Sequence, residues 1–546
     1  MYYKRIHSIK ELLGDEGLWR LPEYLSEEFI EDEQRKNAIE TAKKVLMRGG
    51  NVLIYGSPGT GKTALMFKIL TETFKWAGVG VVDPLTENIG DEHVREGVVI
   101  FIDDLPRLSE KALRSIFIKR VSLIVATARL EELKFIERVV GENPFRHFVG
   151  IELKGMSEEK LREMLIRYAN REGINLVDEE AINIVVNKAS GLPVYIWQVI
   201  RELKIVKKDL TKDFALRIPQ GMYDYVDDIL WRVIGDHEDR YNVLLALLLM
   251  TDMPRYRMHQ DLFNASFVIA KRESMGRQVG LKEALLSDIL DSITRYLARE
   301  ADTYSFRLPH DSWADVLRGR SNGPMSGEIS RINTLFPYAE RRRIIIQAAI
   351  LAWEEILSRI KDPLRKNTFI INLRSALGDR ITGLITDPEG RKQILKEMSD
   401  EIIELINKGA DLKEIKKKVS WLLMFAREGE ILNLLGVNFL RKWEQTKNDE
   451  LFNIGMAILR RANIPKALYN MAKAFLMKKD FASAYNLLRK YLEAAHDADA
   501  YYNMAIACIG LGRYDEALNY LNVYLSQNPK DKNAKKVLEI LASESL

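Results

Sequence analysis

Residues 56–63 have the types and spacing of a phosphate-binding loop. They read Gly-Ser-Pro-Gly-Thr-Gly-Lys-Thr, a complete G-x-x-x-x-G-K-T pattern. Glycines permit a tight loop whose backbone N–H groups surround a phosphate, and the N-terminus of a following helix adds partial positive charge. Lys62 is expected to bridge the β- and γ-phosphates of ATP, and the Thr63 hydroxyl to ligate Mg²⁺. The residues predicted to bind the nucleotide here are Gly56, Ser57, Pro58, Gly59, Thr60, Gly61, Lys62, Thr63 and Ala64.

A pair of carboxylates follows a second apolar run. Residues 98–102 are Val-Val-Ile-Phe-Ile, and Asp103 and Asp104 come directly after them. Asp103 is predicted to hold Mg²⁺, directly or through water, and Asp104 to orient or deprotonate the attacking water. The alternative for Asp104 is that it only caps the following turn. Because an aspartate reaches less far than a glutamate, we expect slow ATP hydrolysis.

Polar residues also end a third apolar run, at residues 123–126. The next residues are Thr127, Ala128 and Arg129. Side chains at the carboxyl ends of strands point into the crevice where open α/β sheets bind ligands. Arg129 is therefore predicted to contact the γ-phosphate and Thr127 the attacking water, although Arg129 in a solvated position remains open. Arg146 is either an arginine that acts on a neighbouring chain's nucleotide or an ordinary surface residue.

The elements that must position these residues alternate between helix and strand. Helices are predicted over residues 31–47 and 62–74, and short buried strands over residues 51–55, 78–82, 98–102 and 123–126. Strands interleaved with helices predict a parallel α/β sheet with helices on both faces. Residues 29–153 are thus a P-loop nucleotide-binding domain, preceded by a short helical lead-in over residues 1–28.

The chain then becomes mostly helical. Residues 154–215 are predicted to form a helical lid domain, with a break at Gly191-Leu192-Pro193. Residues 216–320 contain three or four helices and a small hairpin that includes 304–308, an order typical of a winged-helix domain. Residues 321–327, Ser-Asn-Gly-Pro-Met-Ser-Gly, have the composition of a linker. A helical arm is predicted over residues 321–450.

An internal repeat marks the C-terminal region. Tyr-Asn-Met-Ala at residues 469–472 recurs at 502–505, and Ala484 recurs as Ala517. This period of 33 is close to that of the tetratricopeptide (TPR) repeat, a helix–turn–helix unit, although an ordinary pair of helical hairpins is the alternative. We predict a TPR sensor over residues 451–546, whose stack is extended by degenerate helical pairs from about residue 420.

Composition limits the class of protein further. The chain has 546 residues, 47% hydrophobic and 29% charged, with a net charge of +4. These values predict a folded, soluble, cytoplasmic protein of several domains, without the overall basic charge that favours nucleic acid or membrane as a partner. The single cysteine, Cys508, excludes an internal disulfide framework. No signal peptide or spanning segment is predicted, and abundant Lys and Glu are typical of thermophiles.

Several motifs, in order, resemble those of the STAND ATPases, the signalling branch of the AAA+-like P-loop proteins, which has archaeal members. They are GSPGTGKT, IFIDD, the T-x-R of ATAR, the G-x-P of residues 191–193, and LPHD at residues 308–311, which is similar to M-H-D. The resemblance covers about residues 29–320. It implies a multidomain fold: P-loop core, helical lid, winged helix, then an all-α arm and a TPR superhelix. Pro193 is expected near adenine, and Phe29 and Ile30 near the base, although the family's Gly-Arg pair is absent there.

The resemblance also implies a function. His310 is expected to donate a hydrogen bond to the β-phosphate of ADP. Without the resemblance, the sequence around His310 favours a residue that caps a helix at the surface. The chain is expected to be a switch that is monomeric with ADP, binds an inducer at the TPR region, and oligomerises with ATP. Two alternatives stay open: a DNA-acting AAA+ protein similar to archaeal replication initiators, and a TPR scaffold whose ATPase core is only structural.

Overall fold

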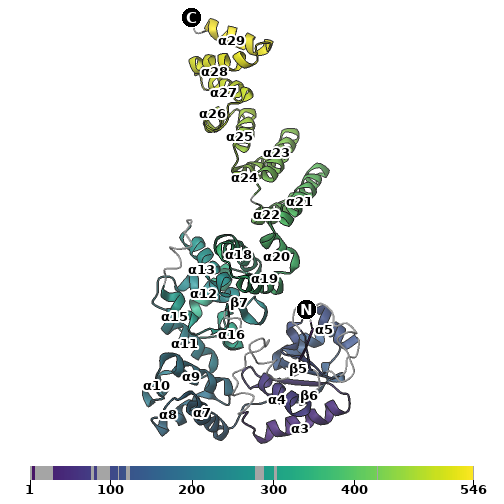
Figure 1. Cartoon of the computed structure of the whole chain (residues 1–546), viewed down its shortest axis with the longest axis vertical. Coiled ribbons are helices and arrows are strands. Elements are labelled where there is room, and N and C mark those ends of the chain that lie inside the picture. The colour runs from purple at the N-terminus through teal and green to yellow at the C-terminus, as the bar shows by residue number, and fades with distance from the viewer. Residues whose placement is uncertain are drawn as a thin grey trace. The chain divides into compact units, whose positions relative to one another are not determined.

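The computed structural model describes residues 3–6, 29–74, 79–82, 99–108, 110–118, 123–276, 288–299, 304–426 and 428–544. The chain divides into two compact units, Met1–Gly378 and Asp379–Leu546, which are described separately (Figure 1). The first contains both β-sheets, and every described element of the second is a helix.

A six-stranded sheet forms the centre of the N-terminal core, in the order β1-β3-β4-β5-β2-β6. All its pairs are parallel except the antiparallel pair of β1 with β3. The strands are β1 (Tyr3–Ile6), β2 (Val52–Gly56), β3 (Val79–Val82), β4 (Val99–Ile102), β5 (Ile124–Arg129) and β6 (Val149–Glu152). The predicted parallel α/β sheet is therefore present.

The predicted helical lead-in is wrong for Tyr3–Ile6, which forms an edge strand. Its backbone bonds to β3, and tyrosine and isoleucine favour strands when a neighbouring edge is available. The rest of that prediction, residues 1–2 and 7–28, lies outside the described residues. So do Gly78 and Val98, the first residues of two predicted strands.

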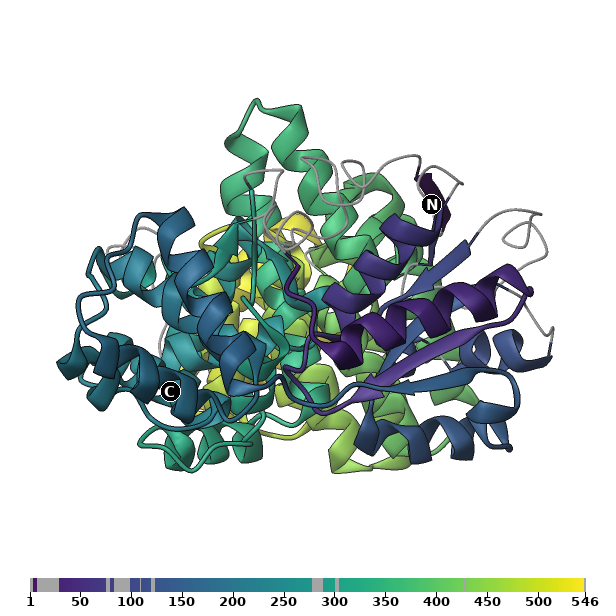
Figure 2. The ribbon, with the colours of Figure 1, turned by 90° about the horizontal axis from the view of Figure 1, so that it is seen from below.

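Helices cover both faces of this sheet (Figure 2). Alternate residues of β2 serve opposite faces: Val52 and Ile54 pack against α3 and α4, and Leu53 packs on the side of α5 and α6. The helical elements of the core are α3 (Glu33–Met47), α4 (Lys62–Phe74), η2 (Leu105–Arg107), α5 (Glu110–Ile118), η3 (Leu130–Glu132), α6 (Leu133–Val140) and η4 (Pro144–Arg146). The two apolar layers hold the strands in place, and the polar residues lie at the strand ends.

The next helices correspond to the predicted lid. They are α7 (Glu158–Glu172), α8 (Glu179–Ala189), α9 (Pro193–Val206) and α10 (Lys212–Arg217). Ser157 caps α7 by accepting from the Lys160 N–H, and Pro193 occupies the first turn of α9, where a missing N–H costs nothing.

A small antiparallel sheet, in the order β7-β9-β8, lies among the helices that follow. The elements are α11 (Met222–Ile234), α12 (Arg240–Met250), η5 (Pro254–Tyr256), β7 (Arg257–His259), α13 (Gln260–Met275), α15 (Asp288–Thr294), β8 (Ala298–Arg299), β9 (Ser305–Arg307) and α16 (Asp311–Leu317). The β8–β9 pairing forms the hairpin that the winged-helix interpretation requires.

The segment that the sequence indicates as a linker is held in place. The Ser321 hydroxyl donates to Asp227 at 2.6 Å, and the Met325 N–H donates to the same carboxylate at 2.8 Å. The helices after it also belong to the first unit, since Asn372 of α19 bonds to the backbone of β7. They are α17 (Ser326–Leu335), α18 (Tyr338–Leu351), η6 (Ala352–Ile356), η7 (Leu357–Arg359) and α19 (Pro363–Leu377). The division at residue 378 thus falls inside the predicted arm.

The second unit is a succession of paired helices (Figure 1). They are α20 (Asp379–Thr386), α21 (Pro388–Lys408), α22 (Leu412–Phe425), α23 (Gly429–Thr446), α24 (Asp449–Ala462), α25 (Pro465–Met477), α26 (Phe481–Leu492), α27 (Ala498–Gly510), α28 (Tyr514–Gln527) and α29 (Lys532–Glu544). Gly436 and Gly455 lie where α23 and α24 cross, and a side chain on Gly436 would meet the Gly455 carbonyl oxygen at 3.1 Å.

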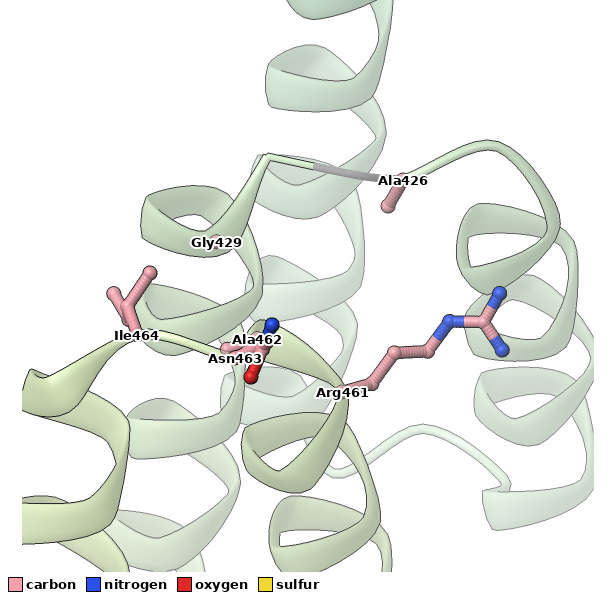
Figure 3. A pocket seen from close by; sticks show the side chains of 6 residues that line it. All are labelled: Ala426, Gly429, Arg461, Ala462, Asn463 and Ile464. Atoms are coloured by element: carbon pink, nitrogen blue, oxygen red, sulfur yellow. The ribbon is translucent and has the colours of Figure 1, made fainter. Parts of the chain in front are cut away.

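Ring contacts repeat with the sequence period of 33. Tyr469 packs on Tyr491 with ring centroids 5.3 Å apart, and Tyr502 packs on Tyr524 at 5.0 Å. Ala484 and Ala517 are fully buried in the same apolar cluster. A hollow of about 440 Å³ lies earlier in this unit, where the side chains of Ile464 and Arg461 point in opposite directions (Figure 3).

Candidate nucleotide-binding site

The predicted loop connects β2 to α4, as the phosphate-binding motif requires. Gly59 and Gly61 have φ angles of 82° and 92°, a region that favours glycine. The Lys62 ammonium donates to the Gly56 carbonyl at 3.1 Å and to the Ser57 carbonyl at 2.9 Å. Burial lowers the pKa of Lys62, although the nearby Asp104 opposes this effect. The lysine is thus held over the loop.

The two predicted Mg²⁺ ligands lie side by side at the strand ends. Thr63 Oγ1 donates to Asp103 Oδ1 at 2.9 Å, and Thr127 Oγ1 donates to the same oxygen at 2.7 Å. This arrangement follows from the sheet order, because β5 lies between β2 and β4. Burial raises the pKa of Asp103, although the hydrogen bond from Thr127 opposes the rise. A cation beside Asp103 would stabilise its charged form and offset the cost of burying that charge.

Asp104 adopts a conformation that is rare for a residue with a side chain. Its φ is 58° and its ψ 69°, and although it stands at the N-cap of η2, its side chain makes no capping hydrogen bond. Instead its carboxylate pairs with Arg107 at 2.6 Å, and its N–H donates to Thr127 Oγ1 at 2.8 Å. Burial raises the pKa of Asp104 to about 7, although Arg107 opposes this. The structure therefore does not use Asp104 as a side-chain cap.

Thr127 bonds to both members of the acid pair. Its hydroxyl accepts from the Asp104 backbone N–H and donates to the Asp103 carboxylate, and the residue is 1% exposed. The predicted contact of Thr127 with the attacking water stays a prediction, because the hydroxyl already bonds to these two residues.

Arg129 is buried and pairs with α16, a helix later in the first unit. Its Nη1 contacts both oxygens of Asp315 at 2.9 Å, and its Nη2 lies 3.5 Å from Asp311 Oδ2. Although burial opposes the charge, these two carboxylates raise the pKa of Arg129. The structure thus excludes the solvated position that the sequence left open for Arg129.

Arg107, which the sequence analysis did not single out, joins the same cluster. Its guanidinium pairs with Asp104 at 2.6 Å and with Asp311 at 3.1 Å, and it donates to the Tyr256 hydroxyl at 2.8 Å. Although burial opposes it, Arg107 holds the pKa of Asp311 far below its usual range. Arg107 therefore links the acid pair at the end of β4 to α16 and to the turn before β7.

His310 caps α16. Its Nδ1 accepts from the Ser312 N–H at 3.1 Å. Burial lowers the pKa of His310 to about 4, although the neighbouring Asp311 opposes this. The ring is therefore neutral at pH 7, and because Nδ1 is an acceptor its proton lies on Nε2. The capping role is observed, and the Nε2–H remains a donor on the other side of the ring.

The G-x-P segment contacts the loop. The Val194 N–H donates to the Gly59 carbonyl at 3.4 Å, and any Cβ on Gly59 would lie 2.5 Å from Val194 Cγ1. Pro193 is buried beside this contact. Phe29 and Ile30 precede α3; Ile30 is 5% exposed, and Phe29 packs against the apolar cluster of α3 and α4. Contacts of these residues with a base stay predictions.

Arg35 is a second residue that sequence reasoning missed. Its side chain is fully buried, pairs with the Asp32 carboxylate, and donates to the Thr60 carbonyl at 2.8 Å. It therefore braces the loop from α3. The sequence signal that could have identified Arg35 is its position three residues after an aspartate that caps a helix. Arg146 lies on the surface, with its side chain 73% exposed and Glu142 at 3.7 Å.

The residues present fit Mg²⁺ with a nucleotide. Mg²⁺ prefers oxygen ligands and usually needs only one or two from the protein beside phosphates and waters. Thr63 and Asp103 supply two adjacent oxygens, and the loop supplies backbone N–H groups and Lys62. No group of three or more His, Cys, Asp or Glu that could hold a metal alone occurs among the described residues.

Comparisons with known proteins find similarity to different parts of the chain. A family model described as tetratricopeptide repeat matches residues 465–541. The RuvB subunit of the Holliday junction branch migration complex of Sulfurimonas denitrificans is 26% identical over 32% of this chain. The match spans only 60% of that relative.

Two solved structures are similar at lower identity. The Thermotoga maritima RuvB motor is 20% identical, with a TM-score of 0.30, over 53% of this chain and 96% of that chain. A STAND protein with a tetratricopeptide repeat sensor from Pyrococcus horikoshii is 13% identical, with a TM-score of 0.29, over 93% and 88%.

The loop, the carboxylates at the strand ends and the parallel sheet define a P-loop α/β nucleotide-binding fold in the N-terminal part. The family match defines α25–α29 as TPR helices. A P-loop core followed by a C-terminal TPR region is the architecture that the resemblance to STAND ATPases implied. In the parts of the chain described, no helix is both long and apolar enough to cross a membrane.

Proposed function

We propose that the chain is a nucleotide-dependent signalling switch that ADP holds closed and exchange to ATP releases. The observation that carries this proposal is the pairing of the strand-end arginines with α16: Arg129 with Asp315, and Arg107 with Asp311. These pairs join the predicted phosphate site to the winged-helix segment. A switch requires two states to which its ligands bind with different free energies, and this contact supplies one such state.

In this proposal the loop binds ADP or ATP, and Lys62 moves its hydrogen bonds from loop carbonyls to phosphate oxygens. Thr63 and Asp103 hold Mg²⁺, which neutralises charge on the phosphates. Asp104 orients or deprotonates the attacking water. Its short side chain and its pair with Arg107 support slow ATP hydrolysis, which resets the switch.

The γ-phosphate is what distinguishes the two nucleotides. Arg129 cannot contact a γ-phosphate fully while both oxygens of Asp315 hold its guanidinium. ATP therefore competes with α16 for Arg129. His310 acts in the opposite sense, because its Nε2–H bonds to the β-phosphate of ADP and keeps α16 at the site. ADP is expected to favour the closed monomer.

The TPR helices are the proposed sensor. Stacked helical pairs form extended surfaces that bind proteins, peptides or small molecules. An inducer bound there releases the closed form, ADP leaves, and the ATP form self-associates. Tyr524 is 9% exposed and belongs to the repeat core, and Tyr501 packs against that core.

A truncation tests this proposal. The truncation ends at residue 378, because residues 321–377 pack within the first compact unit. Residues 1–378 should exchange ADP for ATP faster than the full chain and gain mass with ATP in light scattering. Equal exchange rates and equal masses for the two proteins would contradict restraint by the second unit, leaving it only a recruiting role.

A second candidate function is that of a DNA-acting AAA+ protein, which the local 26% identity to RuvB favours. Contacts to DNA phosphates make affinity fall steeply with salt. Tight duplex binding at 50 mM salt that is lost at 200 mM would support this candidate over the switch.

A further inference from the structure

A cavity of about 570 Å³ lies beside the candidate nucleotide site and is called here the arginine cavity. It is formed by the ends of β4 and β5, the 251–256 turn and the end of α16. Its size is in the range of small-molecule sites. Five guanidinium groups line it, from Arg107, Arg129, Arg255, Arg318 and Arg320.

Carboxylates in the wall do not balance these charges. Only three line the cavity: Glu132, Asp252 and Asp315. Asp252 is already paired, at 2.5 and 3.0 Å, with Arg341, which does not line the cavity. Asp315 is committed to Arg129, and Glu132 accepts the Arg129 backbone N–H at 3.0 Å. Arg107 is paired with Asp104 and Asp311, which do not line the cavity, so the excess of positive charge comes from Arg318 and Arg320.

Arg318 and Arg320 are the two arginines that carry this excess. Arg318 donates to the Thr251 carbonyl at 2.6 Å and lies over the Tyr256 ring, and no carboxylate within the described residues forms an ion pair with it. Arg320 lies 3.5 Å from Glu131 and 3.6 Å from Asp315, forms a hydrogen bond with the Tyr223 side chain, and its side chain is 51% exposed. Both guanidinium groups can donate to an anion, because neither is held in a bidentate pair.

The turn that forms one wall has an unusual backbone. Arg255 and Tyr256 both have a φ of 55°, in the left-handed region that residues with side chains seldom adopt. This conformation presents the Arg255 side chain and the Tyr256 ring in the same wall. Tyr256 also accepts from Arg107 at 2.8 Å, so the wall is connected to the strand-end acids.

We propose that the arginine cavity binds a small anion with adjacent phosphate groups, separately from the nucleotide in the loop. Planar guanidinium groups bind phosphate oxygens in pairs, and several of them converge here on a space of suitable size. Such an anion competes with Asp315 for Arg129 and loosens α16 from the strand ends. This regulatory consequence rests on the proposed switch, whereas the binding itself does not.

Calorimetry with inorganic pyrophosphate and with ADP tests the proposal. The background variant is Lys62→Ala, which weakens phosphate binding at the loop by removing the positive charge of its side chain. In this background we expect saturable pyrophosphate binding, and the further changes Arg318→Gln and Arg320→Gln should weaken it by roughly tenfold or more. Arg295→Gln, an exposed arginine beside a different hollow, is the matched control and should leave the affinity unchanged.

The ADP arm separates a free polyphosphate from a nucleotide as the ligand: ADP binding to the Lys62→Ala variant that Arg318→Gln and Arg320→Gln weaken would identify a nucleoside diphosphate as the anion. Three results would overturn the proposal: neither compound binds the Lys62→Ala variant, pyrophosphate binds only when Lys62 is present, or the two Gln changes leave its affinity the same. None of these results bears on ADP binding to the parent protein, which tests the proposed switch. Thermal midpoints check that each variant is folded.

Discussion

Arg129 and Asp315 form an ion pair between the end of β5 and α16, in which Nη1 of Arg129 lies 2.9 Å from both carboxylate oxygens. Their side chains are 7% and 4% exposed, so both charges are desolvated. Removing one partner of such a pair is costly, because the other charge remains buried. The Arg129 guanidinium therefore pairs either with Asp315 or with another anion that replaces it. This competition for Arg129 is the basis of the proposed switch.

Asp315→Asn tests that choice. The change removes the carboxylate that competes with the γ-phosphate, so the affinity for ATP relative to ADP should rise by about tenfold or more. The nucleotide-free variant should also be less stable, since Arg129 keeps only longer carboxylate contacts, 3.5 Å to Asp311 and 4.0 Å to Glu132. Fluorescent-nucleotide titrations measure the ratio. Asp261→Asn, which breaks a pair with Arg365 in the same unit and does not line the arginine cavity, is the control, and an equal ratio in both variants would argue against competition.

Hydrolysis should depend on the loop lysine and the metal ligand. Lys62→Ala removes the positive charge held over the loop, and Asp103→Ala removes the oxygen that Thr63 and Thr127 both contact. Both variants should lose ATP turnover, which we expect to be slow in the parent protein. Phosphate release assays measure this. Parental turnover in Lys62→Ala would contradict the assignment of the loop.

Two substitutions at His310 separate its role as a helix cap from its proposed hydrogen bond to ADP. Asparagine keeps an N-cap acceptor for the Ser312 N–H but lacks the Nε2 donor, whereas alanine loses both. Loss of one hydrogen bond to a charged group is worth roughly 1.5–3 kcal/mol, so ADP should dissociate one to two orders of magnitude faster from both variants. Chase experiments with fluorescent ADP measure the rate. If His310→Asn released ADP at the parental rate, the residue would be only a cap.

The buried imidazole also predicts a pH dependence of stability. The pKa of His310 is about 4 in the folded chain and near 6.5 when exposed, so the unfolded state binds more protons between these values. The contribution of the neutral imidazole to the free energy of unfolding is fully present above pH 6.5 and is lost as the pH falls. It decreases by about 2 kcal/mol between pH 7 and pH 5. Thermal midpoints of the nucleotide-free protein at the two pH values, compared with His310→Asn, measure this. An equal fall in both proteins would remove His310 as the cause.

Much of the fold was predictable from local patterns. The apolar runs before Asp103 and Thr127 became β4 and β5, and Lys62–Phe74 is helical with the predicted bounds. The period of 33 placed the tyrosine pairs of the repeats in register. These features depend on residues close in sequence, or on strand ends that a parallel sheet must bring to one edge.

The long-range pairs were not predictable in the same way. Asp315 meets Arg129 across 186 positions, and only its spacing of four from Asp311, on one helix face, hinted at a shared partner. The packing of residues 321–377 with the first unit was missed because Ser321–Gly327 has the composition of a linker. Its bonds to the buried Asp227 depend on tertiary contacts that composition does not reveal.

The nucleotide that the purified full-length protein retains tests the central claim most directly. The protein is denatured with acid and its nucleotides are separated by ion-exchange chromatography and counted per chain. A switch closed by ADP should carry close to one ADP per chain, and the Lys62→Ala variant should carry almost none. Retention of no nucleotide, or of ATP in place of ADP, by the parent protein would contradict a resting state closed by ADP.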